Sequence, residues 1–140
     1  MKSLVIINTI IFLSISLLHF YWAMGGKYGG VAVLPSKLDG QLLFKPGLLL
    51  TLAVAFGLLI FALITLGNLS IFDPWMGLNY FHTGTWLIGC IFIARAIGDT
   101  KYIGFFKDIK NTDFARNDSR IYSPLSLMMG AISLLIVTLF

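Results

Sequence analysis

Glutamate is absent from this sequence, and only 11% of its 140 residues are charged. Soluble globular domains usually have about a quarter of their residues charged. The acidic residues are all aspartates, and they lie between the apolar runs or at the ends of these runs. We therefore expect lipid rather than water around most of the chain.

Cysteine is also scarce, since Cys90 is the only one. A single cysteine excludes an internal disulfide, a CxxC redox pair and a multi-cysteine metal site. Motifs of the GxSxG and HExxH types and phosphate-binding glycine loops are missing as well. No catalytic residue can therefore be assigned, and whether the protein is an enzyme stays open.

The two histidines do not predict a haem or metal site. If the helices align as expected, His19 and His82 differ in depth by roughly nine residues, or about 13 Å of helical rise. Two axial ligands must converge on one iron, so a shared haem is not expected. We predict no metal site, and the sequence identifies no cofactor.

Long apolar runs are what the sequence does contain. Four segments have roughly the 20 residues that a helix needs to cross a hydrocarbon core about 30 Å thick. They are residues 4–24, 47–66, 75–95 and 124–140. The sequence therefore predicts an all-α fold, a single-domain integral membrane bundle of four transmembrane helices over residues 1–140.

The two long connectors differ in composition. Residues 25–46 are rich in glycine and proline, which predicts an irregular loop. Residues 98–123 mix aromatic residues with lysines, notably in the stretch 101–110, which predicts a short amphipathic helix on the membrane surface. Asp99 or Thr100 is a candidate cap for that helix.

The basic residues predict the orientation of the bundle. Lysine and arginine are retained on the cytoplasmic side of a membrane, where they meet lipid phosphates. Apart from Lys2, all of them lie in or beside the two long connectors. We expect these connectors to be cytoplasmic, both termini to lie outside, and the protein to reside in the cytoplasmic (inner) membrane. The formal charge of +4 therefore indicates membrane lipids rather than nucleic acid as partners.

Ionisable residues within predicted spans are the candidate site residues, because a charge in lipid needs a partner or a ligand. His19 and Arg95 lie at the connector end of their spans. Arginine offers a planar fork of donors to a carboxylate or phosphate, and histidine exchanges a proton near neutral pH. The predicted ligand-binding group is His19, Trp22, Arg95, Asp99, Asp118 and Tyr122. Alternatively, Arg95 simply pairs with Asp99 or Asp118, and His19 bonds a backbone carbonyl.

Several short motifs run in order along nearly the whole chain. They are His19-Phe20-Tyr21-Trp22, Gly25-Gly26, Lys45-Pro46-Gly47, Arg95 with Gly98-Asp99, Gly104 with Lys107, Phe114-Ala115 with Asp118, and Tyr122-Ser123-Pro124-Leu125. Together they resemble a family of small bacterial four-span membrane proteins that is known only as a domain of unknown function. The resemblance implies a cytoplasmic-membrane protein and supplies no activity.

Three functional hypotheses remain open from the sequence. The first is a polar pocket on the cytoplasmic side that binds a small anionic or amphiphilic ligand, with Arg95 as the anion clamp. The second is a non-catalytic accessory subunit or scaffold of a larger membrane complex. The third is a small lipid-modifying membrane enzyme.

Overall fold

The computed structural model describes residues 2–72 and 74–139. Within these ranges the regular secondary structure is helical, apart from one isolated β-bridge. The long helices are α1 (Lys2–Ala23), α2 (Leu48–Gly67), α3 (Leu78–Ile97) and α5 (Ser123–Leu139). A short helix, α4 (Asp113–Asn117), and a π-helix, η1 (Asp118–Tyr122), lead directly into α5. The predicted all-α fold is confirmed.

Three of these helical stretches are long and apolar enough to cross a membrane. They are α1, α2 and the continuous stretch Asp113–Leu139. Helix α3 has a similar length of 20 residues but contains Asn79, His82 and Arg95, which make it more polar. The fourth span thus stays a prediction.

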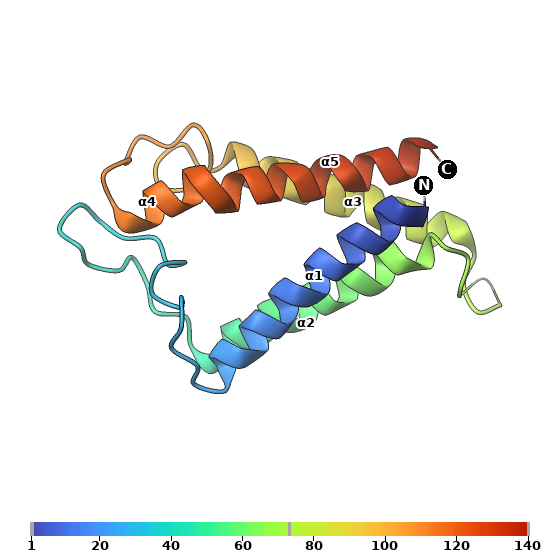
Figure 1. Cartoon of the computed structure of the whole chain (residues 1–140), viewed down its shortest axis with the longest axis horizontal. Coiled ribbons are helices and arrows are strands. Elements are labelled where there is room, and N and C mark those ends of the chain that lie inside the picture. Colours follow the sequence, from blue (N-terminus) through green and yellow to red (C-terminus); the bar gives the residue numbers. More distant parts are fainter. Residues whose placement is uncertain (1, 73, 140) are drawn as a thin grey trace.

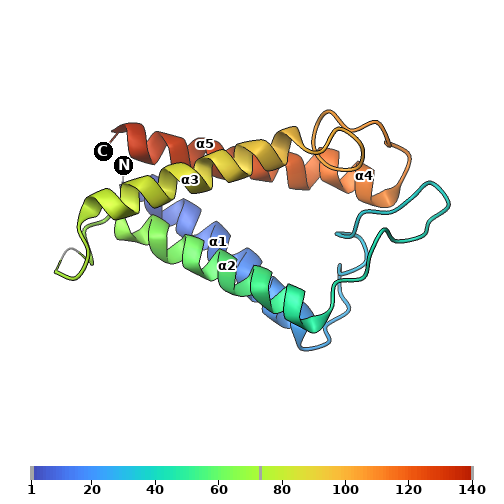
Figure 2. The same ribbon diagram turned by 180° about the vertical axis from the view of Figure 1, so that it is seen from behind.

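The long helices form two pairs, α1 with α2 and α3 with α5. Figures 1 and 2 show that the pairs lie close together where both termini lie and diverge toward the end that holds the two long connectors. Gly130 allows α3 and α5 to approach closely, because a Cβ there would lie 3.0 Å from the backbone nitrogen of Ile93. Small residues commonly permit such contacts between membrane helices.

The core of the bundle contains a layer of three phenylalanines. Phe12, Phe61 and Phe92 pack edge to face, with ring centroids between 5.3 and 6.2 Å apart. Buried Leu58, Ala62, Ile88 and Met129 complete the cluster. Every long helix contributes to this layer, which therefore joins the two pairs.

Two hydrogen bonds also join the pairs, both on the terminal side of the phenylalanine layer. Asn8 Nδ2 of α1 donates to Ser133 Oγ of α5 at 2.9 Å. Asn68 Nδ2, just beyond α2, donates to Thr85 Oγ1 of α3 at 2.7 Å. Polar side chains of this kind link helices where water is absent, so they hold the pairs together at this end.

The connectors are only partly as predicted. Residues 25–46 form an irregular loop with one isolated bridge between Ser36 and Leu42, as expected. The prediction of an amphipathic helix in the stretch 101–110 is wrong, since no helix occurs between residues 98 and 112. The short helix of this connector is α4 instead. Gly98 and Gly104 have φ values of +88° and +93°, which are incompatible with a right-handed helix.

The two glycines also explain the path of the third connector. A Cβ on Gly98 would lie 1.7 Å from the carbonyl oxygen of Ile103, so the backbone folds back closely over the end of α3. Asp99, one of the two predicted partners of Arg95, lies beyond the last residue of α3. Its Oδ1 instead accepts the N–H groups of residues 101–103 at 2.8–3.0 Å, which stabilises a turn.

The phenylalanine layer can be tested by truncation. Phe12→Ala should lower the free energy of unfolding in detergent by about 3 kcal/mol, because it leaves a cavity where three helices meet. The control is Ile10→Ala, whose side chain is 56% exposed on the same helix. Equal losses for the two variants in reversible denaturation would contradict the proposed core.

Candidate functional site at the connector end

Asp118 is the centre of a buried polar cluster at the connector end of the bundle. Its Oδ1 accepts a hydrogen bond from Arg95 Nη2 at 2.9 Å. Its Oδ2 accepts from the backbone N–H of Gly104 at 2.8 Å, from Lys107 Nζ at 3.0 Å and from Ser123 Oγ at 3.1 Å. Full burial of a carboxylate requires such compensation. Of the two predicted partners for Arg95, the structure selects Asp118.

Lys107 is the second cation of this cluster and was not among the predicted site residues. It is only 2% exposed, and besides Asp118 it donates to Gly104 O at 2.8 Å and Ser119 Oγ at 2.7 Å. Three partners satisfy its three donors. Its signal in the sequence was the Gly104-x-x-Lys107 motif, whose two residues are now seen to contact each other.

Arg95 is the member of the cluster that remains partly open. Its side chain is 31% exposed. Its Nη1 is buried and has no hydrogen-bond partner within residues 2–72 and 74–139. Arg95 and Lys107 share the single carboxylate of Asp118, so the cluster has one positive charge in excess. An excess charge with a free donor suits an anionic group.

A layer of polar residues lies two helical turns from the apolar core, on the connector side. A seven-residue step turns an α-helix by about 700°, so the two residues lie within about 20° of each other around the axis. In α1, α2 and α3, and in η1 directly before α5, a polar residue lies seven positions from a residue of the core cluster. The pairs are Phe12 and His19, Leu58 and Thr51, Ile88 and Arg95, and Met129 and Tyr122. The core-facing sides of these four helical stretches therefore each carry a polar residue at similar depth.

His19 and Trp22 belong to the other helix pair. His19 Nδ1 donates to the Ile15 carbonyl at 2.8 Å, so Nε2 is the ring nitrogen that a ligand could engage. The His19 ring packs edge to face with Trp22, whose Nε1 donates to Tyr28 O at 2.8 Å. In the part of the chain that the structure describes, no hydrogen bond or ion pair joins either residue to Arg95 or Asp118.

The remaining predicted site residues have backbone partners. Tyr122 Oη donates to the carbonyl of Ala32 at 3.4 Å, a long contact that links η1 to the first connector. The small burial of Asp99 raises its pKa, but the N–H groups of Ile103, Tyr102 and Lys101 together lower the pKa below its ordinary value. Asp99 is therefore a charged residue of the connector turn rather than part of the Asp118 cluster.

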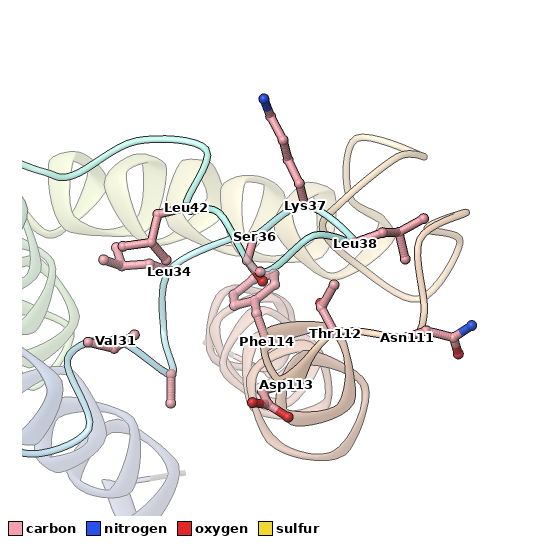
Figure 3. A pocket seen from close by; sticks show the side chains of 12 residues that line it. Val31, Leu34, Ser36, Lys37, Leu38, Leu42, Asn111, Thr112, Asp113 and Phe114 are labelled. Atoms are coloured by element: carbon pink, nitrogen blue, oxygen red, sulfur yellow. The ribbon is translucent and has the colours of Figure 1, made fainter.

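A cavity of about 410 Å³ lies nearby, between the first connector and the start of α4. Leu34, Leu42 and Phe114 line it, whereas the side chains of Lys37 and Asn111 extend away from it (Figure 3). None of the predicted site residues is among those that line this cavity. Its wall is largely apolar, and the lysine beside it, Lys37, points away.

Comparison with known proteins identifies a protein family. A family model described as Protein of unknown function (DUF3995) matches residues 12–133, which include all of the site residues discussed above. No curated protein and no solved structure matches the chain.

The Asp118 cluster makes a quantitative prediction about stability. Asp118→Ala should lower the free energy of unfolding in detergent by about 3–5 kcal/mol, because it leaves the Lys107 ammonium buried without a counter-charge. The matched control is Asp113→Ala, which removes an exposed carboxylate that pairs with exposed Arg116. That control should change stability by less than about 1 kcal/mol. Similar effects of the two substitutions would show that the cluster is not buried.

Proposed function

The chain belongs to the family described as Protein of unknown function (DUF3995), and we propose that it is a four-span protein of the bacterial cytoplasmic membrane that binds an anionic amphiphile. The binding site is the connector end of the bundle. Arg95 is the anion clamp, and His19 on the facing helix pair is a hydrogen-bond partner or proton donor.

The polar layer around Arg95 is the observation that carries this proposal. Core-facing positions of a membrane bundle are normally apolar or paired, because a polar group costs free energy in lipid. Here His19, Thr51, Arg95 and Tyr122 all occupy the continuation of the core-facing side, and Arg95 retains a buried donor with no partner among the described residues. A ligand anion would satisfy that donor and the excess positive charge together.

Asp118 takes a different role in the proposal from that of Arg95. Both of its oxygens already accept hydrogen bonds, and its side chain has no exposed surface. Asp118 therefore positions Arg95 and does not itself need to contact the ligand. In this proposal, Trp22, Asp99 and Tyr122 form the rim of the site.

The proposed placement in the membrane is based on the lengths of the apolar helices and on the positions of the basic residues. Helix α3 packs along α5, which belongs to the apolar stretch Asp113–Leu139 that is long enough to cross, so α3 is proposed as the fourth span. Nine of the ten basic residues lie in or beside the two long connectors, at the end of the bundle opposite the termini (Figure 1). By the preference of basic segments for the cytoplasm, that end is cytoplasmic.

Topology can be tested with a reporter fused after the last residue. We expect a periplasmic reporter at this position to be active, because both termini lie at the end opposite the basic connectors. A fusion that is active only with a cytoplasmic reporter would reverse the orientation and move the proposed site to the outer face.

Ligand binding can be tested by native mass spectrometry of gently extracted protein. Arg95→Gln should reduce retention of phosphatidylglycerol at least tenfold, because it removes the charge and the free donor from the polar layer. Lys107 still pairs with Asp118 in this variant, so the protein should fold. The matched control is Arg120→Gln, which removes an exposed arginine from η1. Equal retention by both variants would reject Arg95 as the clamp.

A further inference from the structure

The sides of the two helix pairs that face each other become less buried toward the connectors. On the core-facing side of α2, Ala55 is fully buried, Thr51 is partly exposed, and Leu48 is 63% exposed. On α1, Ser16 is the last buried residue, and none of residues 17–23 is buried. This loss of burial matches the divergence of the pairs in Figures 1 and 2.

The uncovered region has an apolar floor and a polar rim. Phe12, Phe61 and Phe92 form the layer in which the pairs last meet. The polar layer lies seven residues closer to the connectors, which is about 10 Å of helical rise. That rise exceeds the length of an anionic head alone, and between the two layers α2 presents apolar Val54, which lies four residues before Leu58 and is 40% exposed.

We infer that this region between the helix pairs holds an acyl chain of an anionic phospholipid, with the lipid phosphate at Arg95 and the chain directed toward the phenylalanine layer. The inference rests on the proposed function and specifies the ligand class. Charge complementarity supports the choice, because Arg95 and Lys107 share one carboxylate and Arg95 keeps an unpaired buried donor in the described structure. A free inorganic anion would satisfy Arg95 but would leave the apolar surfaces uncovered.

A bulky side chain on the core-facing side of α2 should compete with the acyl chain. Thr51 precedes Leu58 of the core cluster by seven residues and therefore faces the other pair. Ala53 lies at the same depth, is exposed, and points about 160° away from the position of Ala55. Thr51→Trp and Ala53→Trp are thus a matched pair that adds the same group on opposite sides of one helix.

The test uses the full chain in detergent and native mass spectrometry with three probes: long-chain phosphatidylglycerol, dihexanoyl phosphatidylglycerol and inorganic phosphate. We expect one long-chain molecule to be retained at least tenfold more tightly than either other probe. Thr51→Trp should lose that preference, and Ala53→Trp should keep it. Thermal unfolding by circular dichroism shows whether each variant is folded.

Labelling of the unaltered protein keeps the test decisive if Thr51→Trp does not fold. A photoactivatable group in the acyl chain of the retained lipid should label Thr51 and Val54 in preference to Ala53. Preferential labelling of Ala53, or equal retention of the long-chain and dihexanoyl lipids, would overturn the inference. If the long-chain and dihexanoyl lipids were retained equally, the proposed anion site at Arg95 would still stand. If none of the three probes were retained, both the anion site and the acyl-chain site would be rejected.

Discussion

The burial of one carboxylate determines the structure of the connector end. Asp118 draws a helix residue, Arg95, and two connector residues, Gly104 and Lys107, toward the start of η1. A carboxylate so placed is stable only if every lone pair has a donor. The third connector must therefore fold back over α3, which requires the positive φ angles of Gly98 and Gly104. In this arrangement the side chain of Lys107 is enclosed by the connector, whereas the side chain of Arg95 stays partly exposed.

The interior of the bundle as a whole is as polar as it is apolar. Among the described residues, the buried polar or charged side chains equal the buried apolar ones in number, while many large apolar side chains lie on the outside. In lipid this distribution is favourable, because apolar surface loses nothing by facing the hydrocarbon and polar groups pair inside. The phenylalanine layer thus lies between two polar regions, the Asn8 and Asn68 hydrogen bonds and the polar layer around Arg95.

The long helices could be predicted from the sequence because an apolar run of membrane-spanning length has few alternatives. Each predicted span lies within three residues of the observed helix boundaries. The first connector was also predictable, since its glycines and prolines exclude regular helix. The third was not, because the pattern of Lys107 beside Phe105 and Phe106 is amphipathic in sequence, whereas Asp118 binds Lys107 inside the fold.

The candidate site was predictable only in part, for a similar reason. The depth of His19 and Arg95 followed from counting residues along each helix, and the pairing of Arg95 with Asp118 was one of two alternatives. The divergence of the helix pairs could not be predicted, because hydrophobic periodicity specifies which side of a helix is buried but not the angle between helices. His19 and Arg95 therefore share the connector end of the bundle, but no hydrogen bond joins them in the described structure.

The first connector has a mechanical consequence for the whole bundle. It leaves α1, reaches across to Tyr122 and the start of α4, and returns to α2, as Figures 1 and 2 show. Both helices of one pair are thus linked to the other pair through one connector as well as through the phenylalanine layer. A substitution in this connector that removes its contact with Tyr122 would therefore act on both helices of the pair at once.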